Sequence, residues 1–557
     1  MRPATGRRVR LARVSLALVV VLGAAAVGIA PEPNFDPVMH PPEQSWAPDP
    51  PVTSVHADVV VYGATASGVM AAIAAASEGR SVALVEPTHH VGGMVTGGIS
   101  LTDVGNRSAI GGLALDFYRR VADFYDLLPL GVQAAWNPEP HAAAEILAAM
   151  LREGDVPVYL GQRLRLPDGV VTDGTTITAL RMESGAEFTG SVFVDSSYEG
   201  DLMAAAGVSF RVGREARDEY GEGRAGARRG DRVYPPVAAH YFSGEMAPLT
   251  SVNPPPGPPG SADERVQPYN FRLCFSSVPG NQIPFPRPAG YDLGRFLLLQ
   301  RILDELEERG QRPVLTDILV MSPIPNGKVD VNAASIAGTD LIGGSWAYPD
   351  AGYEERARIW AEHFAYDAGL VYYLANEPTV PNRIRDELGR WGLCRDEWAS
   401  TGGWPPQLYV REARRMVNGS VLTQRDLVDS PRKADAIGLG SYRVDAHTVS
   451  QYEGEGRFLY TEGALSLAVP EPYQVPYGIL VPDPAEVGNL LVTVTVAASH
   501  VAWASLRMEP QFMIMGEAAG VAASLAVRDG IGVADVPAWE LQRHLRLRGS
   551  RIDPLGP

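Results

Sequence analysis

Apolar runs separated by glycine-rich turns form the clearest pattern in this chain. Residues 58–62 (DVVVY) are a short β-branched run, typical of a strand buried on both faces. The turn 63–68 (GATASG) and the alanine-rich segment 69–77 follow, and the latter is predicted to be helical. Residues 81–85 read as a second buried strand that ends at Glu86. The pattern therefore predicts a βαβ unit of about thirty residues.

Further periodic segments extend this reading along the chain. Helices are predicted at residues 112–125, 140–151, 293–309, 353–376 and 508–529, and strands at 156–160, 176–182, 191–195 and 489–496. Between residues 216 and 474 the chain changes to tryptophan- and proline-rich loops with scattered helices. We therefore predict an α/β fold, in which a Rossmann-type nucleotide-binding domain is built from both chain ends, residues 55–215 and 475–557. An α+β substrate or cap domain is inserted at residues 216–474, and a proline-rich tether at residues 31–54 precedes the whole.

The N-terminus has a different composition. Arg7, Arg8 and Arg10 precede an uncharged apolar run at residues 14–30. A basic segment followed by such a run is typical of an export signal, so residues 1–30 are predicted to be a signal peptide. The arginine pair resembles a twin-arginine signal, which suits a protein exported in folded form. The protein is thus expected outside the cell or in the cell envelope. The alternative is an uncleaved anchor, the one case in which we expect membrane contact.

Charge and cysteine content narrow the function classes. The 65 acidic and 48 basic residues give a formal net charge of −17, which disfavours binding to nucleic acid. Neither Cys274 nor Cys394 lies in a CxxC or Cys/His pattern, so we expect no metal site. A single disulfide between them would form in an oxidising compartment. Two separate buried thiols are the favoured interpretation.

The turn after the first strand has the chemistry of a nucleotide site. Gly63 and Gly68 supply the outer glycines of a G-x-G-x-x-G pattern, with Thr65 at the middle position. A helix N-terminus offers unpaired N–H groups to a pyrophosphate, and glycine lets the backbone approach it. Glu86, at the end of the second strand, is placed to accept ribose hydroxyl groups. A dinucleotide cofactor is therefore expected.

A second glycine-rich loop follows Glu86, at residues 89–98 (HHVGGMVTGG). A simple NAD-binding domain would continue into another βα unit at this point. The loop instead indicates backbone that passes a second, larger part of the cofactor, which favours FAD. An NAD(P)-linked dehydrogenase is the less favoured reading.

Several segments, taken with residues 58–98, carry a family resemblance. They are EPH (139–141), VDSSYEGDLMAAAGVSFRVGRE (194–215), YNFRLC (269–274), PNGK (325–328), WPPQLYVREARRM (404–416), GLGSYRVDAH (438–447) and SHVAWASLRMEPQFMIMGEAAG (499–520). The chain resembles the bacterial FAD-dependent oxidoreductase family related to fumarate reductase and succinate dehydrogenase flavoproteins, in particular its xanthan lyase-like branch. The resemblance covers nearly all of the chain after residue 55. It implies a Rossmann-type FAD-binding fold and a redox activity.

The resemblance also implies which residues hold the cofactor. Turn residues and Glu86 should bind the ADP half, and the second glycine loop should run beside the pyrophosphate and ribityl chain. A helix that begins near Met513 should point its N-terminus at the flavin ring, where its dipole would stabilise negative charge. The sequence departs from the usual family pattern at residues 492–496, where Val-Thr-Val occurs. The implied cofactor-binding residues are Gly63, Thr65, Gly68, Glu86, Gly92, Gly93, Met94, Asp201 and Gly516.

Two candidates for the chemistry lie near the C-terminus. His500 stands in an otherwise apolar stretch, and a histidine suits proton transfer near neutral pH. A structural histidine is the alternative. Arg507 is expected to bind a carboxylate or to stabilise the reduced flavin, with capping of the following helix as the alternative.

Two further candidates come from the inserted domain. Arg411 belongs to the segment 409–415, which holds three arginines and one glutamate. This composition fits a carboxylate clamp, or alternatively a solvated helical face. His447 is a candidate acid or base, with Asp445 as its neighbour.

Together these features predict an exported FAD-dependent oxidoreductase. It would transfer a hydride between the flavin and a small polar organic substrate, a sugar derivative or an organic acid, and would need an electron acceptor that the sequence leaves unnamed. A secreted carbohydrate-associated binding or lytic protein that retains this fold is the alternative from another class, because four tryptophans (Trp346, Trp360, Trp391 and Trp404) could stack on sugars.

Overall fold

The first long buried run of the described residues forms a central strand of a mixed, mostly parallel sheet. We analysed a computed structural model that describes residues 38–39, 52–239 and 252–554. In it, β2 (Ser54–Tyr62) is followed by α1 (Ala66–Ser77) and β3 (Val82–Val85), and β3 pairs in parallel with β2. The predicted βαβ unit is confirmed. The predicted signal peptide lies outside the described residues.

A seven-stranded sheet in the described part of the chain draws on both ends of the sequence. Its strands run in the order β4 (Val158–Tyr159), β3, β2, β7 (Glu187–Asp195), β6 (Thr176–Arg181) and β5 (Val170–Asp173), and β23 (Leu490–Val492) also pairs with β7. The first half of β7 pairs antiparallel with β6, and its second half pairs in parallel with β23. A strand from near residue 490 therefore completes a sheet begun at residue 54.

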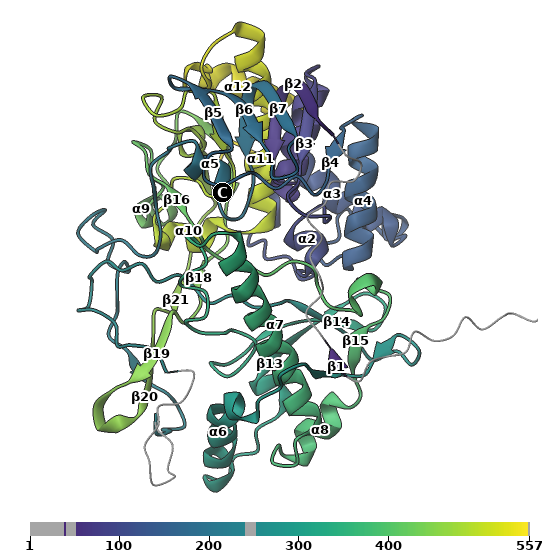
Figure 1. Cartoon of the computed structure of the whole chain (residues 1–557), viewed down its shortest axis with the longest axis vertical. Helices are drawn as coiled ribbons and strands as arrows, with labels where there is room; N and C mark the ends of the chain where they lie inside the picture. Colours follow the sequence, from purple (N-terminus) through teal and green to yellow (C-terminus); the bar gives the residue numbers. More distant parts are fainter. Residues whose placement is uncertain (1–37, 40–51, 240–251, 555–557) are drawn as a thin grey trace, which may run out of the picture. The chain divides into compact units, whose positions relative to one another are not determined.

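Two helices from opposite ends of the chain pack tightly on each other and on this sheet. The helix α11 (Glu509–Asp529) contacts α1, β2 and β7, and Figure 1 shows it, in yellow, beside the purple strands β2 and β3. A Cβ atom on Gly516 would lie 2.1 Å from the Ser67 carbonyl oxygen, and one on Gly520 would lie 2.2 Å from that of Ala71. Glycine at these positions therefore lets the two helix backbones approach closely.

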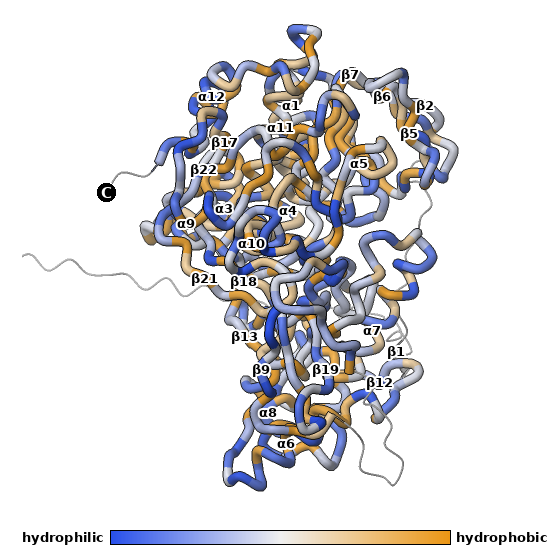
Figure 2. The backbone as a smooth tube through the Cα atoms, turned by 90° about the vertical axis from the view of Figure 1, so that its left-hand side faces the viewer, coloured by the Kyte–Doolittle hydropathy of each residue, from blue (hydrophilic) through white to orange (hydrophobic). Residues whose placement is uncertain are grey.

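The interior around these helices is apolar. In Figure 2, the sheet strands and the helices α1 and α11 carry much of the hydrophobic colouring. By length and composition α11 could cross a membrane, but 94% of its apolar window is buried within the protein, as expected of a core helix. Other helices of this part are α3 (Gly112–Phe124), α4 (Pro140–Glu153) and α12 (Ala538–Leu547).

The inserted region contains an antiparallel sheet that the sequence pattern did not predict. It has five strands in the order β11 (Gln282–Ile283), β15 (Gly392–Cys394), β10 (Leu273–Ser276), β14 (Lys328–Ala333) and β13 (Leu319–Ile324). Its helices are α6 (Leu297–Glu308), α7 (Tyr353–Asn376) and α8 (Asn382–Leu388). These strands are short and distant in sequence, so no single window shows their alternation. The α/β fold with an inserted α+β region is confirmed.

A disulfide joins Cys274 in β10 to Cys394 in β15. The expectation of two separate thiols was wrong. The two strands are neighbours in the sheet, which brings the Cα atoms to 5.5 Å from each other across 120 residues of sequence. Sequence separation alone hides this proximity.

Shorter elements connect these parts. The helices are α2 (Met94–Gly97), α5 (Asp201–Ala205), α9 (Gln424–Asp429) and α10 (His500–Leu506). Four two-stranded pairs are β1 (Val38–Met39) with β12 (Arg287–Pro288), β8 (Phe210–Arg211) with β16 (Arg415–Met416), β17 (Ala436–Gly440) with β22 (Tyr473–Pro476), and β18 (Val444–Ala446) with β21 (Leu465–Leu467). In a three-stranded sheet, β20 (Leu459–Glu462) pairs with both β19 (Ser450–Glu453) and β9 (Asp231–Arg232). The boundaries 55–215, 216–474 and 475–557 stay predictions.

Two sequence expectations about local structure were wrong. Residues 31–54 are not all tether, because β1 within them pairs with β12 and β2 begins at Ser54. The strand expected at residues 489–496 ends at Val492. Beyond it the Thr493 hydroxyl turns inward to hydrogen-bond the hydroxyls of Ser67 and Ser196.

The tryptophans offered for sugar stacking lie mostly in the core. Trp404 is 1% exposed, and its ring meets those of Phe271 and Phe364 edge-on. Trp360 stacks on the Phe364 ring. Trp346 and Trp391 are partly buried against the same core. Core packing therefore accounts for them.

Candidate cofactor cleft and active site

The turn between β2 and α1 is built so that only glycine fits at its two ends. Gly63 has a φ of +93°, and a Cβ atom there would lie 2.7 Å from the Ser197 backbone nitrogen. A Cβ atom on Gly68 would lie 1.9 Å from the Gly63 carbonyl oxygen. Thr65 is the N-cap of α1, because its hydroxyl accepts a hydrogen bond from the Gly68 N–H (3.3 Å) and donates one to the Ser196 carbonyl (2.8 Å). The turn thus fixes the start of α1 against the end of β7.

A cleft with about 900 Å³ of empty volume lies at the carboxyl ends of β2, β3 and β7, and we call it the nucleotide cleft. Its lining includes Gly63, Thr65, Glu86, His90, Gly93, Tyr198, Asp201, Arg356 and Leu408. The Glu86 carboxylate accepts hydrogen bonds from the Ala64 N–H (2.7 Å) and from the N–H and hydroxyl of Thr88 (2.8 and 2.6 Å). Burial raises the pKa of Glu86 to about 7. Glu86 therefore lies in the cleft wall, where its role as ribose acceptor stays a prediction. Its carboxyl group is ionised mainly near or above neutral pH.

The second glycine loop docks directly onto this turn. The Gly92 N–H donates to the Ala64 carbonyl across 2.7 Å, and Gly92 and Gly93 have φ values of +100° and +56°. A Cβ atom on Gly93 would lie 2.5 Å from the Tyr198 hydroxyl oxygen, which also accepts a hydrogen bond from the Met94 N–H (2.9 Å). The loop can therefore pass close to Tyr198 only because it carries no side chain at this point.

Asp201 lies in the cleft lining but is occupied by two arginines. Arg356 donates to both of its oxygens, across 2.6 and 2.9 Å, and Arg414 donates across 2.8 Å. Burial alone would raise the pKa of Asp201, but the two guanidinium groups lower it below its ordinary value. Direct contact of Asp201 with the cofactor stays a prediction. Gly516 does not line the cleft, and its position is explained by packing against α1.

The helix expected to begin near Met513 begins four residues earlier, at Glu509, with Pro510 in its first turn, where proline is favoured. The Glu509 carboxylate accepts a hydrogen bond from the Tyr198 hydroxyl (3.0 Å). The start of α11 therefore lies beside Tyr198 in the wall of the nucleotide cleft, next to the second glycine loop.

Three guanidinium groups surround Tyr409, the residue that follows the cleft-lining Leu408. Arg507 donates to the Tyr409 hydroxyl across 2.7 Å. The guanidinium carbon of Arg411 lies 4.6 Å from the centre of the Tyr409 ring. Arg272, which is paired with Asp330 across 2.5 Å, also lies within electrostatic range of Tyr409. We call this group the arginine–tyrosine cluster, and its members are Arg272, Asp340, Tyr409, Arg411, His447 and Arg507.

Asp340 joins two predicted site residues within this cluster. One of its oxygens lies 2.5 Å from His447 Nδ1, and the other lies 2.8 Å from Arg411 Nη1. Burial and the Arg411 guanidinium lower the pKa of His447 below its ordinary value, so the ring is neutral at neutral pH. The carboxylate partner of His447 is therefore Asp340, whereas the neighbouring Asp445 carboxylate pairs with Arg443 (3.3 Å) and the Asp445 carbonyl accepts a hydrogen bond from Arg507 (2.8 Å).

The arginine-rich segment is neither helical nor solvated. Residues 409–414 have no regular secondary structure, and Arg411 is 1% exposed. Among the described residues, the Nε atoms of Arg411 and Arg507 are buried without a hydrogen-bond partner. Two guanidinium groups thus retain unused donors in the interior, as a site for an anionic or polar ligand requires.

His500 lies in a neighbouring network. Its Nδ1 lies 2.9 and 3.0 Å from the two Glu412 oxygens, and its backbone N–H donates to Glu215. Gln267 lies between the two groups of residues and bridges them. Its side-chain NH2 group donates to Glu412 (3.2 Å), and its side-chain oxygen accepts from the His447 backbone N–H (3.1 Å). The structure therefore brings Arg411, His447 and Arg507 into one cluster and leaves His500 outside it.

These features fit FAD. Glycine cradles at Gly63 and Gly93 leave room for a ligand that approaches the backbone, and Glu86 can accept from a ribose. Next to the cleft-lining residue Tyr198, Glu509 Oε2 and, two residues further along the chain, Gln511 Oε1 are buried atoms without a partner among the described residues. Both belong to the first turn of α11, where the polar edge of a flavin ring would supply hydrogen-bonding groups.

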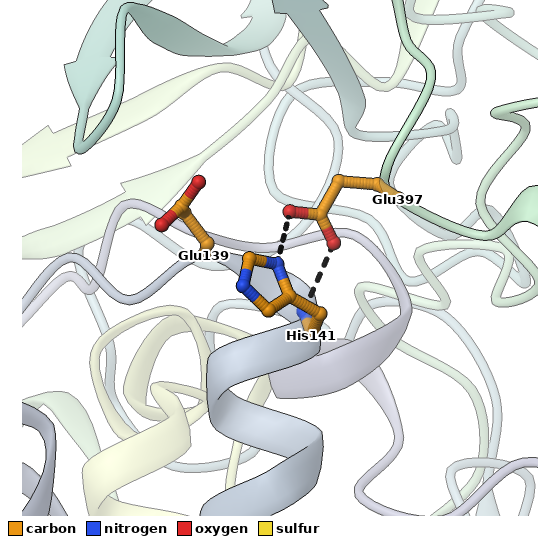
Figure 3. A group of neighbouring side chains, drawn as sticks. All are labelled: Glu139, His141 and Glu397. Atoms are coloured by element: carbon orange, nitrogen blue, oxygen red, sulfur yellow. Dashed lines mark hydrogen bonds and ion pairs between the residues drawn. The ribbon is translucent and has the colours of Figure 1, made fainter. Parts of the chain in front are cut away.

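A third polar cluster, shown in Figure 3, consists of Glu139, His141 and Glu397, whose ligand atoms lie within 4.8 Å of one another. His141 Nδ1 lies 2.7 Å from Glu397. The buried Lys328 ammonium lies 2.6 Å from Glu139 and 2.7 Å from both Glu397 and Asp396. Because Lys328 already neutralises these carboxylates, the group is an ion-pair junction between α4 and the inserted region, and a metal ion would have to displace the lysine.

Several residues of the site were missed in the sequence reading. Tyr198, Arg272, Tyr409 and Glu509 lie inside the quoted family segments, so the segments marked their neighbourhood without revealing their roles. Asp340 lies in no recognised segment, and Arg356 lies on a predicted helix with no motif. For these two, no local signal exists, because Asp340 pairs with Arg411 and His447, 71 and 107 residues away, and Arg356 pairs with Asp201, 155 residues away.

Comparison with known proteins agrees with this geometry. Residues 58–545 match the model of a family described as FAD dependent oxidoreductase. No curated protein matches the sequence.

Among solved structures, a flavin-containing monooxygenase from Stenotrophomonas maltophilia is 15% identical, with 29% of this chain and 42% of that chain covered and a TM-score of 0.19. A 3-ketosteroid dehydrogenase from Rhodococcus jostii, in complex with 4-androstene-3,17-dione, is 17% identical, with 27% and 48% covered and a TM-score of 0.17. The chain therefore spans less than half the length of either structure, and likenesses this low support no argument. The assignment rests on the family match over most of the chain, which shows that this protein belongs to the FAD-dependent oxidoreductase family and has its Rossmann-type fold.

Proposed function

We propose that this enzyme is exported and that it transfers a hydride between FAD and a small polar organic substrate, a sugar derivative or an organic acid. Electrons would then pass to an acceptor of unknown identity. The observation that carries the proposal is the arrangement of His447, Asp340 and Arg411 beside Arg507 and Tyr409. It places a neutral imidazole, held by a carboxylate, next to fixed guanidinium donors.

Each member of the cluster has a defined part in such a reaction. FAD bound in the cleft would supply hydride acceptance or donation. His447 would take the substrate hydroxyl proton on Nε2, because Asp340 fixes Nδ1 and the side chain is 20% exposed. Arg411 and Arg507, with their unused Nε donors, would orient the polar groups of the substrate.

Export is supported by the cysteines. The Cys274–Cys394 disulfide suits an oxidising compartment, where such bonds form and persist. The arginine pair and apolar run of the first thirty residues point the same way. The motifs at residues 194–215 and 499–520 support placement in the xanthan lyase-like branch of the family.

The test is anaerobic reduction of the purified protein by a panel of sugars, hydroxy acids and amines. We expect a yellow protein whose flavin absorption bleaches with one class of substrate and recovers on adding an electron acceptor. A protein that is colourless and cannot be reconstituted with FAD contradicts the proposal. A flavin that none of the panel reduces rejects the substrate class.

A further inference from the structure

Glu509 is a buried carboxyl group whose single partner, Tyr198, lies in the wall of the nucleotide cleft. It is 6% exposed, and one of its oxygens accepts a hydrogen bond from the Tyr198 hydroxyl, while the other has no partner among the described residues. Tyr198 in turn accepts from the Met94 N–H and lies against Gly93 in the cleft wall. The carboxyl group is thus linked through one hydroxyl to the loop that is expected to run beside the cofactor.

The groups that face Glu509 give it no counter-charge. Tyr118, on α3, lies within electrostatic range of it, and Tyr409 lies within range of Tyr198. Arg507 is near in sequence, but its guanidinium turns to Tyr409 and to the Asp445 carbonyl. No ion pair in the described part of the chain includes Glu509. Burial therefore dominates, and it raises the pKa of Glu509 to about 8.

A carboxyl group in this setting responds to charge placed beside it. Two electrons added to the cofactor without a matching number of protons leave negative charge near the start of α11. That charge disfavours the ionised form of Glu509, since two like charges in a poorly solvated region repel each other. A proton bound from solvent removes the repulsion.

We propose that Glu509, hydrogen-bonded to Tyr198, binds one proton from solvent on two-electron reduction at the FAD site in mildly alkaline solution, where it is ionised in the oxidised protein, and releases it on reoxidation. The electrons come from the substrate, the proton comes from water, and it resides on the unpartnered Oε2. Glu509 is then a charge-compensating residue that tunes the redox potential of the enzyme. The inference rests on FAD binding, and it is independent of which substrate is oxidised.

The test is the midpoint potential of the FAD-loaded protein, measured between pH 6 and pH 10 by dye-linked reduction. Above about pH 8 the wild-type potential should fall more steeply, by an additional ~30 mV per pH unit, because one extra proton per two electrons shifts the equilibrium tenfold per pH unit. In Glu509→Gln the extra slope should be absent. In Tyr198→Phe it should begin at a higher pH, because loss of the donated hydrogen bond destabilises the carboxylate.

Glu517→Gln is the matched control. Glu517 lies on the same helix and is equally buried, but it pairs with Arg548 and caps the start of α3 through the Leu113 N–H. This variant should lose stability and keep the extra slope. A second readout, the absorption of the oxidised flavin against pH, should show a transition near pH 8 in the wild type and none in Glu509→Gln.

A wild-type potential that changes with one constant slope from pH 6 to pH 10 overturns the inference, as does an identical bend in Glu509→Gln. If Glu509→Gln fails to bind FAD, the wild-type bend and its shift in Tyr198→Phe still decide the question. Failure of the wild type to hold FAD counts against the proposed function instead, and failure to find a substrate leaves this measurement unaffected.

Discussion

The nucleotide cleft and the arginine–tyrosine cluster are both polar and buried, but they are built from different materials. The cleft is formed mainly by backbone, in two glycine turns that are close in sequence, and its acid Glu86 is held by N–H and hydroxyl groups. The cluster is formed by side chains from five separate segments, and carboxylates compensate two of its three guanidinium groups, Arg272 through Asp330 and Arg411 through Asp340. A backbone site is sensitive chiefly to added atoms, whereas a side-chain site is sensitive to removed ones, because each deletion leaves a buried charge unpaired.

The largest expected effect is on turnover, in the cluster. Replacement His447→Gln removes the proton acceptor and should lower kcat by about 10²–10⁴-fold without changing FAD content. The rate of anaerobic flavin bleaching measures it. His544→Gln is the control. It changes a histidine of α12 that pairs with Glu78, and it should leave the rate unchanged. A rate within about threefold of wild type in His447→Gln would remove this residue from the chemistry.

Removal of one partner of a buried ion pair should come next. Arg356→Gln leaves Asp201 with Arg414 alone and should destabilise the protein by about 3 kcal/mol, measured by denaturant unfolding. Arg358→Gln, on the same helix, breaks only exposed pairs with Glu355 and Glu362 and should leave the stability nearly unchanged. Equal losses in the two variants would contradict the contrast between buried and exposed charge.

An added methyl group tests the backbone site. Gly63→Ala forces a Cβ atom against the Ser197 nitrogen at a positive φ, and the strain of about 1–3 kcal/mol should weaken FAD binding by roughly 10–100-fold. Gly79→Ala has a similar φ of +82° but meets nothing within 4 Å, so its FAD affinity should match wild type. Fluorescence titration with FAD separates the two variants. Unchanged affinity in Gly63→Ala would show that the turn does not approach the cofactor.

The smallest effect should be at the junction in Figure 3. The Glu397 carboxylate raises the pKa of the half-exposed His141 above its ordinary value of 6.5, so the protonated ring stabilises the folded state. This stabilisation is fully present below pH 6.5 and is lost as the pH rises through the folded-state pKa.

His141→Gln should therefore be less stable than wild type at pH 5.5, by less than about 1 kcal/mol, and the difference should shrink by pH 9. Urea unfolding at the two pH values measures it. A difference that grows with rising pH would show that the pair does not act through a protonated histidine.

Local sequence patterns predicted the nucleotide cleft well. The βαβ unit and the position of Glu86 at the end of its second strand follow from residues within one window of about thirty, where strand, turn and helix preferences agree. The long helices α7 and α11 were also located to within one residue, because their periodic patterns extend over more than twenty positions. Short strands such as β10 and β15, with 4 and 3 residues, carry no such signal.

The arginine–tyrosine cluster could be predicted only in part. Arg411, His447 and Arg507 were chosen for their chemistry, and the structure brings them together. Their partners Asp340 and Tyr409 were not found. A side chain's partner depends on which strands and loops meet, and chemical type alone does not specify that.

The sequence by itself determined that residues 58–86 form a nucleotide-binding βαβ unit and that a family of FAD enzymes shares the motifs of this chain, because local propensities and glycine spacing act over short distances. Only the tertiary structure decided that Cys274 meets Cys394, that Asp340 joins His447 to Arg411, and that Glu509 is buried beside Tyr198. These contacts join residues from 71 to 311 positions apart, and their electrostatics follow from burial, a property that exists only once the chain has folded.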